Sequence, residues 1–223
     1  MTFLRQVWAI ARRDLRIEGR AGEVTSVVLP FAAVAVFVVP LATNTLQTRL
    51  ADIAWPIYWL VALLFGMQVT LRQTATETQT QRRHLTLLGI DPAARFAGRA
   101  LSAAVLMLGV LMVTAPLVIL FYNTDPVPRL WIMLPVLVLF SAGLAMLATL
   151  AGDVTVGLRA RSALAPLIVA PLAVPLLVSA SQTLESLSRG DSTLTPILLL
   201  VMANLALSAT VALAARPLED ATT

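Results

Sequence analysis

Six long apolar stretches alternate with short polar segments along the chain. An α-helix needs roughly 20 mostly apolar residues to cross the hydrocarbon core of a bilayer, and each stretch has about that length. The pattern predicts an all-α membrane protein with six transmembrane helices in a single transmembrane domain that spans residues 1–223. The predicted spans are residues 24–43, 53–71, 99–122, 130–151, 163–184 and 194–215.

A different periodicity precedes the first span, in residues 1–20. Arginines occupy many of the positions between the apolar ones in this segment. The apolar side chains recur at spacings of three and four, at Leu4, Val7, Trp8, Ala11 and Leu15. This pattern predicts a basic amphipathic helix that lies in the membrane interface with a tryptophan anchor. The alternative is a charged tail that only helps to set the topology.

The arginines are unequally divided between the two predicted sides of the membrane. One side has only Arg49, Arg129 and Arg189. The polar segments on the other side contain Arg5, Arg12, Arg13, Arg16, Arg20, Arg72, Arg82, Arg83, Arg95, Arg99, Arg159, Arg161 and Arg216. Because cytoplasmic loops carry an excess of basic residues, the division predicts that both termini are cytoplasmic.

The composition leaves little of the chain for a soluble domain, since 58% of the residues are hydrophobic and 13% are charged. The net charge of +4 is explained by topology, so it does not indicate nucleic-acid binding. The expected partner of the basic side is the lipid bilayer, with its anionic head groups.

Several kinds of site are excluded by residues that the sequence lacks. The chain has no cysteine and no lysine, so it has neither a disulfide nor a normal Walker A site. Its single histidine, His84, excludes a bis-histidine haem or metal site. No carboxylate falls in the middle of a span, which argues against proton-driven transport. We therefore expect a non-enzymatic subunit without a directly bound cofactor, and any ATP dependence must come from a partner.

The longest polar segment between spans is residues 72–98, on the predicted cytoplasmic side. Its polar stretch is compatible with a short helix parallel to the membrane, which would present a surface to a cytosolic partner. His84 lies in this segment, where a structural or partner-contacting role is expected. The second cytoplasmic connection, residues 152–162, is shorter.

Five aromatic residues lie close to the predicted external ends of the spans. Tryptophan and tyrosine are enriched at membrane interfaces, so these residues are expected to form an aromatic belt. They are Trp55, Tyr58, Trp59, Tyr122 and Trp131.

Polar side chains and prolines within the spans suggest two further features. Gln68 and Asn204 are the main intramembrane polar residues, and hydrogen bonding between helices is favoured over substrate binding. The fifth span contains Pro166, Pro171 and Pro175, which predict a kinked or locally broken helix. Such a helix is either a functional hinge or a fixed kink that helps packing.

Two stretches resemble a known family. Residues 13–16 (RDLR) and the entry into the first span at residues 23–30 form one of them. The other is residues 155–185, where a Thr-Val-Gly-Leu-Arg turn precedes a span punctuated by prolines. With the order and size of the segments, they resemble the CcmB (haem exporter protein B) family over nearly the whole length. These proteins are permease-like membrane subunits of the ABC-type complex of System I cytochrome c maturation.

The resemblance implies an ABC-exporter-like permease fold in the bacterial inner membrane. It also implies that Gly157, Arg159, Pro171 and Pro175 match positions of the family. The candidates for coupling the chain to an ATPase lie in the two cytoplasmic connections and are Glu77, Arg82, Arg83, His84, Gly157 and Arg159. One stretch departs from the family, which usually has D-G-x-L-E-x-L-x-L-x-P in the first cytoplasmic loop. Here residues 80–90 read TQRRHLTLLGI, and Arg83 stands at the position of the glutamate.

The partners implied by the resemblance are a CcmA-like ATPase, a CcmC-like haem-binding membrane protein, a CcmD-like small subunit and a CcmE-like haem chaperone. ATP would act through the ATPase, the complex would handle haem, and two copies of this chain would pair by analogy with other ABC systems. The alternatives are a permease for another amphipathic substrate and a passive membrane scaffold.

Overall fold

The computed structural model describes residues 2–42, 47–76, 90–124, 130–155 and 161–220. These residues form α-helices and one π-helical turn, and no strand occurs among them. The all-α fold expected from the sequence is therefore confirmed. The elements are α1 (Phe3–Ala21), η1 (Val24–Val28), α2 (Leu29–Ala42), α3 (Gln47–Thr76), α5 (Pro92–Tyr122), α6 (Leu130–Val154), α7 (Arg161–Arg189) and α8 (Leu194–Asp220).

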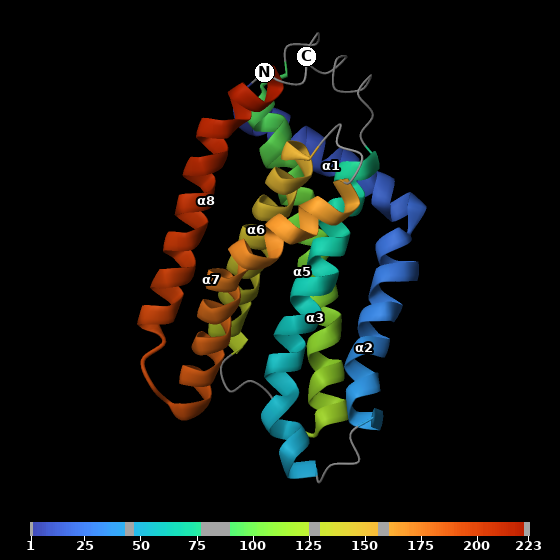
Figure 1. Cartoon of the computed structure of the whole chain (residues 1–223), viewed down its shortest axis with the longest axis vertical. Helices are drawn as coiled ribbons and strands as arrows, with labels where there is room; N and C mark the ends of the chain where they lie inside the picture. The colour runs from blue at the N-terminus through green and yellow to red at the C-terminus, as the bar shows by residue number, and fades with distance from the viewer. Residues whose placement is uncertain (1, 43–46, 77–89, 125–129, 156–160, 221–223) are drawn as a thin grey trace.

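Six of these segments are long and apolar enough to cross a membrane, and they run along the bundle in Figure 1. Helix α1 instead lies obliquely across one end of the bundle, and both chain termini lie at that same end. We call this the arginine-rich end, because α1, the end of α3 and the start of α5 bring their arginines to it.

Helix α6 is the centre of the bundle. It packs against α3, α5, α7 and α8, and 61% of its span is buried inside the chain, against 22% for Val24–Ala42 and 17% for the α8 span. The rings of Trp59 and Phe140 meet edge to face, with centroids 5.0 Å apart, where α3 packs on α6. Helices α2 and α8 are therefore peripheral, and most of their surface faces outward.

The expected aromatic belt is only partly present. Tyr58, Trp59 and Tyr122 are buried within the bundle, with exposed fractions of 0%, 1% and 0%, whereas Trp131 is 74% exposed. Position along a span sets the depth of a side chain, but the face of the helix decides whether it meets lipid or protein. Three of the five aromatics thus belong to the core.

Helix α7 is continuous from Arg161 to Arg189, so the three prolines do not break it. Figure 1 shows α7 bending, with its first part oblique and its second part along the bundle axis. Each proline lacks the N–H that would bond to the carbonyl four residues earlier, which explains the bend. Pro171 and Pro175 are exposed and Pro166 is half-buried.

Candidate functional site

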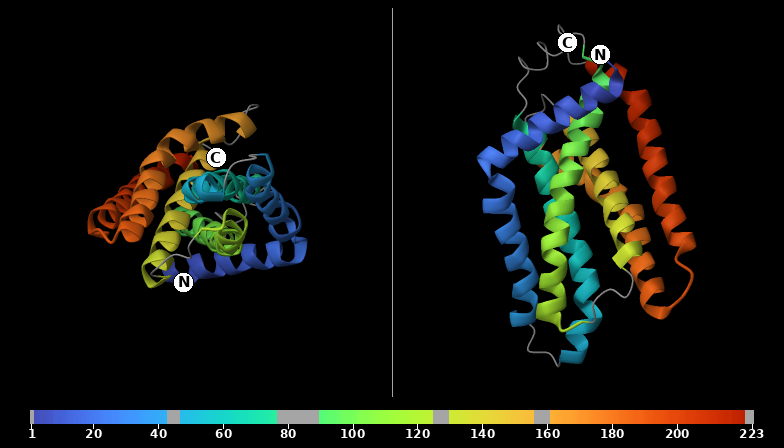
Figure 2. Two further views of the ribbon diagram at one scale, coloured as in Figure 1. Left: turned by 90° about the horizontal axis from the view of Figure 1, so that it is seen from below. Right: turned by 180° about the vertical axis from the view of Figure 1, so that it is seen from behind.

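The arginine-rich end is organised around the crossing of α1 over α5 (Figure 2). Ile10 and Ala11 are buried on the inner face of α1. Below them, α5 has Gly98, where a Cβ atom would lie 2.8 Å from Ile10 Cβ and 2.9 Å from the Val7 carbonyl oxygen. Such distances are too short for any larger residue, so glycine allows the two helices to approach this closely.

The start of α5 is tied to α1 by a polar contact. Asp91 is the N-cap of α5, and its Oδ1 accepts a hydrogen bond from the Ala93 N–H at 2.9 Å. The Asp91 N–H donates to Gln6 Oε1 at 3.3 Å. Pro92 follows at the first helical position, where its missing N–H has no cost. Helix α5 therefore begins at Pro92, whereas the hydrophobic pattern predicted a span from residue 99.

A buried ion pair joins α5 to α6. Arg99 Nη1 lies 2.9 Å from Asp153 Oδ1, and the two side chains are only 5% and 11% exposed. Arg95, one turn earlier on α5, is also buried. A buried charge is costly unless it is paired, so this contact fixes the end of α6 relative to the start of α5.

A turn between α1 and η1 directs the chain from the end of the bundle into the first span. Gly22 ends α1 with a positive φ of 66°, a conformation that favours glycine. The Glu18 carboxylate accepts a hydrogen bond from the Val24 N–H, and Ser26 Oγ donates to the Gly22 carbonyl. The widened π-helical turn that follows accommodates Pro30, which cannot donate to the carbonyl four residues before it.

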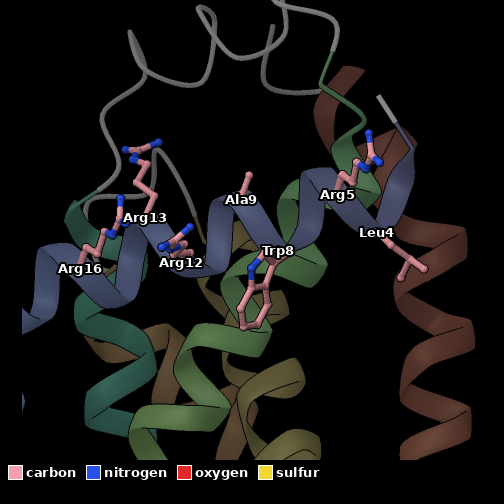
Figure 3. Close-up of a pocket in the computed structure, with 7 residues that line it drawn as sticks. All are labelled: Leu4, Arg5, Trp8, Ala9, Arg12, Arg13 and Arg16. Atoms are coloured by element: carbon pink, nitrogen blue, oxygen red, sulfur yellow. The ribbon is translucent and has the colours of Figure 1, made fainter.

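The outer face of α1 is amphipathic, as the sequence predicts. Figure 3 shows Leu4 and Trp8 pointing along the bundle, whereas Arg5, Arg13 and Arg16 point away from it. Leu4 is 76% exposed and Trp8 is 61% exposed.

The predicted ATPase contacts lie outside the described residues. They are Glu77, Arg82, Arg83, His84, Gly157 and Arg159. The described residues that flank these two segments lie at the arginine-rich end, at the end of α3, the start of α5, the end of α6 and the start of α7. Both predicted cytoplasmic connections therefore leave and re-enter the bundle at this end.

The two intramembrane polar candidates have different surroundings. Gln68 is exposed on the surface of α3. Asn204 is buried at the junction of α6 and α8, and its Nδ2 donates to the Leu200 carbonyl of its own helix at 2.8 Å. A Cβ atom at Gly143 of α6 would lie 3.1 Å from Asn204 Oδ1 and 2.9 Å from Leu176. Asn204 thus lies where three helices approach closely, but its amide bonds within α8 and its Oδ1 has no hydrogen-bond partner among the described residues, so the expected bond between helices is not seen there.

Among the described residues, no group of three or more histidine, cysteine, aspartate or glutamate side chains could bind a metal ion. The feature that the sequence reasoning missed is the Arg99–Asp153 pair. Opposite charges at the ends of two consecutive spans, on the same predicted side, are the signal that could have identified it.

Comparison with known proteins identifies the family of this chain. Residues 5–218 match the family model described as CcmB protein. Heme exporter protein B of Rhodobacter capsulatus is 30% identical over 195 residues, which cover 86% of this chain and 88% of that protein. A family match over nearly the whole chain, together with six membrane-spanning helices, shows that this multi-pass membrane protein belongs to the CcmB family.

Proposed function

We propose that this chain is the membrane subunit of a haem export complex in cytochrome c biogenesis. It couples ATP hydrolysis by a CcmA-like ATPase to haem handling and to the release of a haem-loaded, CcmE-like chaperone. CcmC-like and CcmD-like membrane proteins complete the complex. The family match and the name of the relative, Heme exporter protein B, support this assignment. The arginine-rich end faces the cytoplasm of a bacterial inner membrane, as the arginine distribution favours.

The observation that carries the coupling proposal is the buried Arg99–Asp153 contact at 2.9 Å. Residues 77–89 lead into α5, and residues 156–160 follow α6. A displacement of the first segment would move the start of α5 and, through the ion pair, the end of α6. Packed helices respond to such displacements as rigid elements, which is how ATPase movements reach the spans of a transporter.

Two alternatives make different predictions. A permease for another amphipathic substrate would also need an ATPase, but not the haem chaperone. A passive scaffold would bind the same partners, yet its complex would release the chaperone at the same rate with and without ATP. We expect the purified chain to hydrolyse no ATP alone, because it has no lysine for a Walker A site.

The predicted contacts can be tested with the double variant Arg82→Glu/Arg83→Glu. Reversing two charges should reduce co-purification of the ATPase subunit, while the amount of chain inserted in the membrane stays unchanged. Arg20→Glu is the control, since Arg20 lies on α1 rather than in the first connection. If the ATPase co-purifies equally with the unchanged chain, the double variant and the control variant, residues 82 and 83 do not contact the ATPase.

A further inference from the structure

A groove opens between α5 and α8, with α6 as its floor and Phe3 of α1 at one end. Its volume is about 330 Å³. Alanine, leucine, methionine and valine side chains dominate its lining, including Ala97, Leu101, Ala104, Met146 and Val211. Ser208 contributes a hydroxyl to the lining, and this group already donates to the Asn204 carbonyl at 2.8 Å. The groove therefore offers an apolar surface within the membrane-spanning part of the bundle.

A strip of side chains on the outer face of α1 lies beside the mouth of this groove. The strip encloses a shallow space of about 470 Å³, and its members recur at helical spacing: Leu4, Arg5, Trp8, Ala9, Arg12, Arg13 and Arg16. It contains four arginines and no acidic residue. In Figure 3, Arg5 and Arg12 stand on either side of Trp8, whose ring points along the bundle.

The groove and the strip meet at the N-terminus of α1, where Phe3 lines one and Leu4 lines the other. The back view in Figure 2 shows α1 crossing over α5, with its N-terminal end toward α8. Positive charge on α1, nearest at Arg5, thus lies beside the Phe3 end of an apolar groove. A phospholipid has the complementary arrangement, with an anionic phosphate joined to apolar acyl chains.

We propose that this is a binding site for one anionic phospholipid of the leaflet on the arginine-rich side. Arg5 and Arg12 bind its phosphate, Trp8 packs against the glycerol region, and one acyl chain occupies the groove between α5 and α8. Arginine binds phosphate oxygens through two parallel N–H donors, which suits this role. The bound lipid connects α1 to α8, whose span has the smallest buried share, 17%.

A protein helix is a poorer occupant of the same groove. An apolar partner helix would contact the groove but would bring no anionic group to the arginines beside it. The four arginines of the strip favour an anionic ligand, and a phospholipid supplies the anionic and the apolar part in one molecule.

Photo-crosslinking of the full-length chain in detergent micelles tests the site. The probe is phosphatidylglycerol with a diazirine in one acyl chain, compared with phosphatidylcholine that has the same acyl chains. We expect phosphatidylglycerol to label peptides that contain residues 97–104, 146 or 208–211 at lower concentration than phosphatidylcholine. Equal labelling by the two lipids, or labelling spread evenly over α2 and α7, would overturn the proposal.

Two sets of variants test the binding of the lipid head group and the binding of the acyl chain separately. Arg5→Gln/Arg12→Gln should lower the apparent affinity for the phosphatidylglycerol probe roughly 30-fold, whereas Arg20→Gln should leave it unchanged. Ala104→Leu fills the groove and should abolish labelling of α5 and α8 by either lipid. Its control is Ala206→Leu, on the exposed face of α8, which should label normally.

If Ala104→Leu does not fold, Ala97→Leu provides a second test of the groove. A photoreactive residue at position 104 in cells gives an independent result, with a lipid-sized mass increase expected on the intact chain. A crosslinked polypeptide there would mean that a protein occupies the groove, and the lipid site would be rejected. None of these outcomes depends on an ATPase or on haem.

Discussion

At the residue scale, the Arg99–Asp153 pair is the feature with the largest expected energetic effect. Its side chains are 5% and 11% exposed, so neither charge is solvated by water to a useful extent. The pair need not add much net stability compared with two apolar residues of similar size. Removing one partner is different, because it removes this buried ion-pair contact while the other charge stays buried.

We predict that Asp153→Asn lowers the free energy of unfolding by about 3 to 5 kcal/mol. The double variant Arg99→Met/Asp153→Leu should recover most of this loss, since both charges are then absent. Unfolding in mixed detergent micelles measures the values. The exposed Arg189–Glu185 pair is the control, and Glu185→Gln should cost less than about 1 kcal/mol. A loss below about 1 kcal/mol for Asp153→Asn would show that the pair is not buried as described.

At the element scale, the position of α1 depends on its close approach to α5 at Gly98. The inner face of α1 contacts protein, whereas Leu4 and Trp8 on its outer face are exposed. An isolated amphipathic helix would bind the interface wherever lipid allowed it. Packing on α5 and the Gln6–Asp91 contact instead fix α1 in one place.

The bend in α7 has a physical cause in its prolines, and its use as a hinge stays a prediction.

We predict that Gly98→Ala destabilises the chain by about 1 to 3 kcal/mol, because the added methyl group overlaps Ile10 and the Val7 carbonyl. Gly109→Ala on the same helix is the matched control. No atom lies within 4 Å of a Cβ at residue 109, so this change should be neutral or slightly stabilising. Thermal unfolding of the two purified variants gives the comparison. Equal stabilities would contradict the proposed contact between α1 and α5.

At the scale of the whole molecule, the six-helix architecture followed from hydropathy and the arginine distribution. Six apolar stretches of sufficient length are expected to form six membrane-spanning helices, because every backbone polar group in lipid must be paired and an α-helix pairs them within one stretch. Which face of each helix points inward could not be predicted in the same way. Tyr58, Trp59 and Tyr122 lie near the predicted external ends of their spans, yet they are on helix faces that pack inside the bundle, so they are buried.

The candidate site was predicted less completely than the fold. The candidate ATPase contacts lie in the two cytoplasmic connections, outside the described residues, and only Gly157 and Arg159 among them come from the resemblance. The Arg99–Asp153 pair and the Gly98 crossing depend on which spans are neighbours and on the rotation of each helix. A single sequence indicates where its spans end but not which spans are neighbours or how each helix is rotated. The ion pair and the helix crossing are therefore seen only in the three-dimensional structure.

Topology can be tested directly because the natural chain has no cysteine. We predict that Asp191→Cys, between α7 and α8, reacts in intact cells with a maleimide that cannot cross the inner membrane. Arg20→Cys, at the end of α1, should react only after that membrane is opened. Both positions are exposed, so their accessibility to the reagent is comparable. The reverse result would invert the predicted orientation.

The central claim is that this chain transmits ATP hydrolysis to chaperone release, and the amount of haem-loaded chaperone on the purified complex tests it most directly. We predict that the chaperone leaves after ATP is added and stays bound when a non-hydrolysable analogue replaces ATP. With Asp153→Asn, the chaperone should stay bound although the ATPase still hydrolyses ATP. Release at the same rate without hydrolysis would contradict the account and indicate a passive scaffold.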